Sequence, residues 1–142
     1  KKKKKQYGAM VEEKPPVESG ELVNWLKKNQ VKNKSRAYKM EVRESKKAIL
    51  KYQLIGRSKN YFYLKIDPMT GRHHQIRVQL SFIGCRIKGD VKYGAKRTNK
   101  DGGIHLFARS ISFIHPIKKE ELTITANPPV DPLWNEFLNL SS

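Results

Sequence analysis

The sequence is poor in cysteine and in long apolar runs. Cys85 is the single cysteine among 142 residues, so an internal disulfide framework is excluded and a reducing compartment is favoured. We expect this thiol to be a small buried group at the end of a helix. No apolar run approaches the roughly 20 residues that cross a bilayer, and the chain opens on five lysines instead of an apolar signal core. These absences favour a cytoplasmic protein that does not bind membranes.

Acidic residues are also scarce. Thirteen Asp and Glu stand against thirty Lys and Arg, which leaves a formal net charge of +17. Such a field attracts polyanions, because binding releases their condensed counterions. Nucleic acid is the first candidate partner and an anionic membrane the second, but no basic helix with an exposed apolar face is evident. A solvated basic surface without a partner is the remaining alternative.

The chain is long enough for one domain with a hydrophobic core, and strand patterns dominate it. We predict strands at 7–11, 48–56, 61–67, 104–116 and 122–127, and helices at 21–29, at 71–84 and from Asp131–Pro132 onward. The basic, polar stretch at 30–47 is expected to be an exposed loop that leads into a strand. The two strands at 48–67 have the form of a hairpin. Because most strands follow one another without helical crossovers, we expect an α+β fold with a mostly antiparallel mixed sheet and a few helices.

The predicted helix at 71–84 carries an unusual polar stripe. At about 100° per residue, apolar side chains fall on two nearly opposite faces, and between them run His73, Arg77 and Ser81. Arg77 is therefore predicted to be partly desolvated, and a desolvated guanidinium needs a carboxylate or phosphate in its planar fork. One alternative is an internal ion pair with Asp67 or Asp90, which the periodicity favours. The other is a catalytic carboxylate or a nucleic-acid phosphate.

The sequence offers little support for a metal site or for a nucleotide-binding loop. Adjacent histidines on a helix, His73 and His74, point about 100° apart, and one cysteine offers no zinc ligand set. The segment "GCRIKGD" lacks the lysine that a P-loop needs. We therefore predict no metal and no cofactor.

Three stretches, "TGRHHQIRVQL", "GCRIKGDVKYG" and "LFARSISFIHP", resemble in order and spacing the C-terminal half of RluA-type pseudouridine synthases. "KKQYGAMVE" is similar to the strand that precedes them in that family. The resemblance runs from about Lys4 to Pro129 and implies a pseudouridine-synthase-like fold. It also implies conversion of uridine to pseudouridine in structured RNA, without cofactor, on a nucleotide flipped out of its stack. Ribosomal RNA is the first expected substrate and tRNA the second.

The resemblance also assigns roles to residues. Arg77 matches the family arginine that pairs with the catalytic aspartate, and Tyr7 matches the tyrosine that stacks near the flipped base. Phe107 stands where family members commonly have histidine. For RNA contacts we single out the following residues of the central segment and of the glycine- and lysine-rich loop behind it: Arg72, His73, His74, Lys88, Lys92 and Arg97. A solvated basic face explains the lysines nearly as well.

The sequence departs from the family in one important respect. The family aspartate stands in a segment like "HRLDxxTSG", and no "RLD" occurs in these 142 residues. We therefore expect residues 1–142 to be the C-terminal part of a single catalytic domain that is inactive alone. The alternatives are a non-catalytic RNA-binding module of the same fold, or a small basic protein of a ribonucleoprotein. We expect a monomer without DNA partners.

Overall fold

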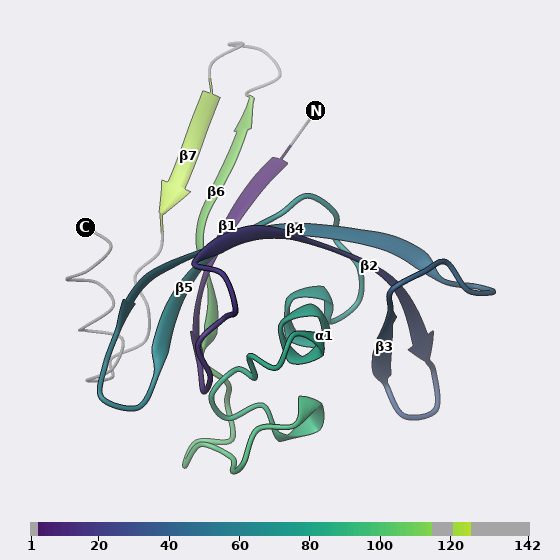
Figure 1. The fold of residues 1–142 in the computed structure, drawn as a ribbon. Coiled ribbons are helices and arrows are strands. Elements are labelled where there is room, and N and C mark those ends of the chain that lie inside the picture. The colour runs from purple at the N-terminus through teal and green to yellow at the C-terminus, as the bar shows by residue number, and fades with distance from the viewer. Residues whose placement is uncertain (1–2, 115–120, 126–142) are drawn as a thin grey trace.

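A single antiparallel sheet organises the chain. The computed structural model describes residues 3–114 and 121–125, with side chains from residue 5 to residue 108. Its elements are β1 Lys3–Val11, β2 Ser19–Asn29, β3 Lys34–Tyr38, β4 Lys46–Arg57, β5 Phe62–Pro68, α1 Gln75–Phe82, the 3-10 helix η1 Val91–Tyr93, β6 Leu106–Ile114 and β7 Glu121–Thr125. The seven strands lie in the order β3-β2-β4-β5-β1-β6-β7 (Figure 1). All six pairings are antiparallel, as predicted.

The core lies where the sheet curves over α1 (Figure 1). Alternate residues of β1, β4 and β5 point to this side, and the buried cluster comprises Ala9, Val11, Leu50, Tyr52, Leu64, Ile66, Ile76, Leu80, Cys85 and Ile87. Each fully buried Leu or Ile side chain contributes roughly 1.5–3 kcal/mol relative to an exposed one. This burial anchors α1 against the sheet and fixes the direction in which its polar residues point.

The predicted helix at 21–29 is wrong. These residues form β2, which pairs with β4 from Ser19↔Gln53 to Leu26↔Lys46 and with β3 on its other side. Asn24 and Leu26 are buried at alternate positions, as in a strand, whereas Leu22, Trp25 and Leu26 also have the spacing of one helical face. Two ladders of backbone hydrogen bonds outweigh a weak helical propensity. The described part is therefore more sheet-dominated than predicted, with α1 as its one α-helix.

The remaining predicted elements are mostly confirmed. The strands at 7–11, 48–56, 61–67 and 122–127 correspond to β1, β4, β5 and β7, and the strand at 104–116 corresponds to β6. The exposed loop predicted at 30–47 is wrong in part, because Lys34–Tyr38 within it form β3. The predicted helix from Asp131 lies outside the described residues. None of the described helices has the length and apolar character needed to span a membrane.

Cys85 is the small buried group that the sequence predicts. It follows α1, its backbone N–H donates to the Leu80 carbonyl at 2.9 Å, and the residue is only 1% exposed. Burial, assisted by the nearby Glu13 carboxylate, raises the pKa of the Cys85 thiol to about 11. The thiol therefore stays protonated and unreactive at neutral pH.

The loop behind α1 returns to the sheet through Ile87, which bridges to Val11. Gly89 follows with φ +89°, and a Cβ there would lie 2.7 Å from the Gly103 carbonyl oxygen and 2.5 Å from Asn99 Nδ2. Gly89 therefore allows the backbone to turn into Asp90.

Gly89→Ala is expected to destabilise the protein by more than about 1 kcal/mol, because alanine is strained at positive φ and its methyl group clashes with backbone. Urea unfolding measures the loss. Gly102→Ala is the control, because its φ is also positive, at +76°, but no atom lies within 4 Å of the added Cβ. Equal losses in the two variants would mean that backbone strain alone, and not the close packing of this loop, makes Gly89 necessary.

Candidate functional site

Arg77 projects from α1 into a paired arrangement with Asp90. Its Nε donates to Asp90 Oδ2 at 2.9 Å and its Nη2 to Asp90 Oδ1 at 2.7 Å, a bidentate salt bridge. The Asp90 side chain is 1% exposed and that of Arg77 is 21% exposed. The hydrogen bond to Asp90 raises the pKa of Arg77 against the opposing effect of burial. The predicted partial desolvation is therefore confirmed, and so is the internal ion pair with Asp90; Asp67 instead accepts from Gln6.

A second network holds the other side of the guanidinium. Arg77 Nη1 lies 3.2 Å from His74 Nε2, and His74 Nδ1 lies 2.7 Å from the Tyr93 hydroxyl. Because an arginine can only donate, Nε2 must accept and the proton of neutral His74 must sit on Nδ1. The Tyr93 hydroxyl also accepts from the Ser35 backbone N–H at 2.9 Å, and its ring lies 5.0 Å from the Arg77 guanidinium. Arg77 is thus held by Asp90 and Tyr93 of the loop behind α1 and by His74 at the start of its own helix.

The two histidines lie differently from the prediction. His74 is the N-cap of α1 with φ 54°, so the helix begins only at Gln75 and His73 lies outside it. The left-handed residue turns the two rings onto each other, and they stack at 3.8 Å between centroids. His73 therefore does not belong to the predicted polar stripe, whose other members, Arg77 and Ser81, lie on α1 and both contact Tyr93. The expected divergence of about 100° between the two histidines is wrong. His73 instead contacts Ser35 Oγ at 2.9 Å and Asn33 Oδ1 at 3.1 Å.

His74 makes stability depend on pH. Burial first, and then the charges of Arg77 and its neighbours, lower the pKa of His74 from 6.5 to about 4. Between these two pH values the unfolded chain binds a proton that the folded chain does not bind. The contribution of neutral His74 to stability is therefore fully present above about pH 6.5 and is lost as the pH falls toward 4. In urea unfolding at several pH values, His74→Gln is expected to show a shallower loss across this window. An unchanged slope would mean that other groups dominate.

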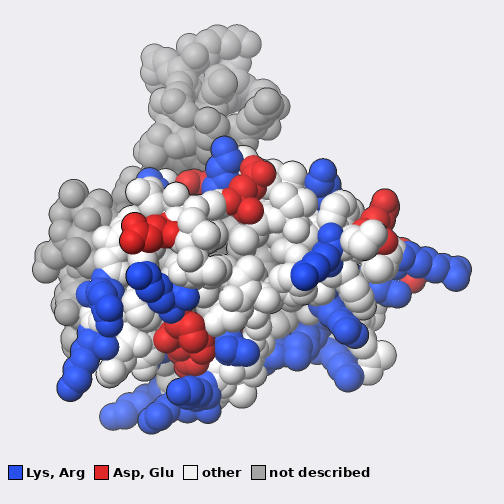
Figure 2. All heavy atoms as spheres, in the orientation of Figure 1, with Lys and Arg blue, Asp and Glu red and all other residues white. Residues whose placement is uncertain are grey.

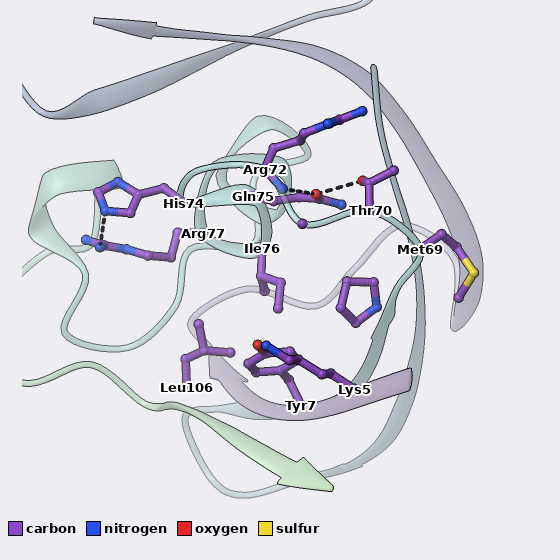
Figure 3. Close-up of a pocket in the computed structure, with 12 residues that line it drawn as sticks. Lys5, Tyr7, Met69, Thr70, Arg72, His74, Gln75, Ile76, Arg77 and Leu106 are labelled. Carbon is purple, nitrogen blue, oxygen red and sulfur yellow. Dashed lines mark hydrogen bonds between the residues drawn. The ribbon is translucent and has the colours of Figure 1, made fainter. Parts of the chain in front are cut away.

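A cavity of about 410 Å³ lies between α1 and the sheet, beside this network. Figure 3 shows Tyr7 and Lys5 coming from β1, Ile76 pointing toward the Tyr7 ring, and Leu106 beside it. Tyr7 and Arg77, which are 70 positions apart in the sequence, line the same cavity. The cavity thus combines an aromatic and aliphatic floor with Arg77 on one wall.

Gln75 is a site residue that the sequence reasoning missed. Its Oε1 accepts from Thr70 Oγ1 at 2.8 Å and from the Arg72 backbone N–H at 3.0 Å, and its Nε2 donates to the Ile49 carbonyl at 3.0 Å. These bonds shape the turn that forms the cavity rim (Figure 3). A glutamine at the first position of the helix was the available signal.

The structure separates the six predicted RNA-binding residues into two groups. The first group contains Arg72 and His74, which line the cavity. It also contains His73 and Lys92, which contact the Asn33–Ser35 segment; Lys92 Nζ donates to the Asn33 carbonyl at 2.9 Å. Lys88 lies elsewhere, against Asn99 and the Tyr61 ring, and Arg97 is exposed in the following loop. Among the described residues, no three His, Cys, Asp or Glu side chains gather closely enough to hold a metal ion.

Sequence comparisons point to one family. The profile of the RNA pseudouridylate synthase family matches residues 1–82. A ribosomal large subunit pseudouridine synthase C of Buchnera aphidicola subsp. Baizongia pistaciae is 32% identical over 97% of this chain and 45% of its own length. A tRNA pseudouridine synthase C of Haemophilus influenzae is 37% identical over 56% of this chain and 35% of its own length. The chain therefore spans less than half the length of these relatives.

The fold comparison agrees. The solved structure of human RNA pseudouridylate synthase domain containing 1 superposes with a TM-score of 0.72 at 18% identity, over 93% of this chain and 57% of the human one. A second human protein, domain containing 4, gives 0.70 at 21% identity, over 96% and 61% of the two chains. With the profile covering more than half of the sequence, the chain belongs to the RNA pseudouridylate synthase family and is of the RluA type.

Proposed function

We propose that this protein converts uridine to pseudouridine in structured RNA in the cytoplasm, with ribosomal RNA as the first candidate substrate and tRNA as the second. The relatives named above support both substrate classes, since one is named for the large ribosomal subunit and one for tRNA. The net charge of +17 supports a polyanionic substrate.

The observation that carries the proposal is the meeting of Tyr7 and Arg77 in one cavity. Its volume of about 410 Å³ lies in the range of small-molecule sites, roughly 300–1,000 Å³. A uridine flipped out of its stack would find an aromatic face in Tyr7, and such stacking contributes roughly 1–3 kcal/mol per base. Tyr7 is therefore proposed to hold the base beside the reacting atoms.

Arg77 is proposed to hold the catalytic carboxylate. A guanidinium has five N–H groups, and three have partners among the described side chains: two on Asp90 and one on His74. The two that remain can bind a second carboxylate, which would keep it ionised and aimed at the sugar–base bond. In this arrangement Asp90 positions Arg77 and takes no part in the chemistry.

The catalytic carboxylate itself is proposed to lie outside these 142 residues. The three described aspartates, Asp67, Asp90 and Asp101, do not line the cavity, and the sequence has no "RLD" segment. Without that aspartate, the step that breaks the bond between C1′ and N1 has no nucleophile or base. Residues 1–142 alone would therefore bind RNA without converting it, as the C-terminal part of one catalytic domain.

A non-catalytic RNA-binding module of the same fold is the second candidate. It is favoured by the bidentate salt bridge between Asp90 and Arg77, because this pair already neutralises the charge of the guanidinium without a further carboxylate. The two candidates differ in what the whole gene product does to uridine.

The test uses ribosomal RNA and tRNA carrying tritium at C5 of uridine. Isomerisation replaces the C5–H bond with a bond from C5 to C1′, so the label is released to water. We expect release by the full-length gene product and none by residues 1–142. Tight RNA binding by the full-length protein with no release from either RNA would contradict the isomerase and leave the RNA-binding module.

A further inference from the structure

A second hollow adjoins the candidate uridine cavity. It has a volume of about 500 Å³ and shares Gly71 and Arg72 with that cavity. Its lining includes Lys27, Lys28, Ser35, Lys46, Arg72 and His73. We call this hollow the basic groove. Because the two hollows have rim residues in common, a polymer chain that leaves the cavity at Arg72 enters the basic groove directly.

The charge of the basic groove is strongly positive. Four of its lining residues are Lys or Arg, and Glu44 is the single acid among them. Figure 2 shows blue Lys and Arg side chains gathered at the lower right of this face, toward the end of the sheet where β3 lies in Figure 1, with few red ones among them. Burial and the charges of Lys28, Lys92 and Arg77 lower the pKa of His73, in agreement with a positive local potential.

Arg72 lies on the ridge between the two hollows. Its Nε donates to the Lys47 carbonyl at 2.8 Å, which anchors the side chain, and among the described residues no hydrogen bond or salt bridge occupies its two terminal nitrogens. The residue is exposed. An arginine that is held by Nε and open at both terminal nitrogens is prepared to bind a phosphate through two parallel hydrogen bonds.

The lining of the basic groove distinguishes backbone from base recognition. Lys27, Lys28 and Lys46 contribute ammonium groups, and His73, the one ring in the lining, is already stacked on His74 and bonded to Ser35 and Asn33. Stacking of bases needs free aromatic faces, whereas contacts to phosphates are made mainly by cationic and hydrogen-bonding side chains such as these. The basic groove therefore fits the phosphates of a strand without regard to its sequence.

We propose that the basic groove holds the sugar–phosphate backbone of the RNA strand next to the target uridine, with Arg72 binding the first phosphate outside the cavity. This inference rests on the proposed function only for the identity of the nucleotide in the cavity. The basic groove supplies register for that nucleotide, because phosphates held outside the cavity limit how far the flipped base can move within it.

The test measures how the full-length gene product binds a fluorescent ten-nucleotide oligouridylate from 50 to 300 mM KCl. Lys28→Met/Lys46→Met is expected to make the negative slope of log K, the association constant, against log salt shallower by about 1.4, since each phosphate contact in a single strand contributes about −0.7. This corresponds to about 25-fold weaker binding at 0.1 M salt. Arg72→Met is expected to make this negative slope shallower by about 0.7.

The matched control is Lys51→Met/Lys59→Met, which removes the same charge from exposed positions of β4 and the following turn. Its slope is expected to stay near that of the unmodified protein. Equal slopes in the two double variants would overturn the proposal and leave only diffuse attraction by the net charge. Thermal melting of all variants checks that each is folded.

Tritium release by the same proteins separates the two proposals. If release is absent in the unmodified protein but the slopes still differ between the double variants, the isomerase fails and the basic groove stands. If release is normal and the slopes do not differ, the basic groove fails and the isomerase stands. If both hold, the Lys28 and Lys46 double variant is expected to raise KM strongly and to lower kcat to a smaller extent, because binding is lost together with some of the register.

Discussion

Asp90→Asn is expected to destabilise the protein by roughly 3–5 kcal/mol, the loss typical when one partner of a buried ion pair is removed. Asp90 is 1% exposed and accepts two charge-assisted hydrogen bonds from Arg77. An amide cannot neutralise the guanidinium, and its NH₂ group would face an N–H donor. The measurement is urea unfolding at pH 7. Asp101→Asn is the control, because Asp101 is exposed and an asparagine there keeps the oxygen that accepts the Gly103 N–H. We expect this variant to lose less than about 0.5 kcal/mol of unfolding free energy.

A double-mutant cycle tests whether the pair itself is responsible. Arg77→Met leaves the Asp90 carboxylate buried without its partner, so it is also expected to be strongly destabilising. The variant that combines Arg77→Met with Asp90→Asn should lose less than the sum of the single variants, with a coupling energy of about 0.5–3 kcal/mol. Additive losses would show that the salt bridge stabilises nothing by itself, and that the two residues act through other contacts.

Arg77→Lys in the full-length gene product is expected to lower kcat for tritium release by about 10²- to 10³-fold, the usual loss when one preorganised donor is removed from an active site. Lysine keeps the charge, but its single ammonium group cannot bond Asp90 through two atoms and still hold a second carboxylate. KM should change little, because the lost contact orients the carboxylate and does not bind RNA.

The control for this prediction is Arg57→Lys. Arg57 is exposed at the far end of β4, where its guanidinium lies over the Phe62 ring, and its replacement should leave kcat unchanged. Arg77→Lys activity within about threefold of the unmodified protein would mean that Arg77 serves stability through Asp90 alone. The catalytic role would then have to be withdrawn, and the non-catalytic module would gain support.

Several features were predictable from the sequence because they depend on local pattern. Alternating residues in β1, β4 and β5 predicted an antiparallel sheet, and apolar residues around Arg77 predicted its partial burial. The motifs from Thr70 to Gly94 predicted the family. Each of these features depends on neighbours within a few positions or on the linear order of short motifs, and a sequence records both directly.

Other features depended on contacts between distant residues. The segment at 21–29 fits a helix and a strand equally well, and only its pairing with β4 and β3 makes it β2. The left-handed conformation of His74 stacks it on His73, which no helical wheel shows.

By itself, then, the sequence determined the family, the antiparallel sheet and the need of Arg77 for an anionic partner. The tertiary structure decided which anion that is, because Asp67 and Asp90 were equal candidates until the turn at Gly89 placed Asp90 beside the guanidinium. It also placed Tyr7 and Arg77 around one cavity. The physical reason is that periodicity describes which face of an element is buried, whereas the partner across that face is chosen by packing between segments that lie far apart in the chain.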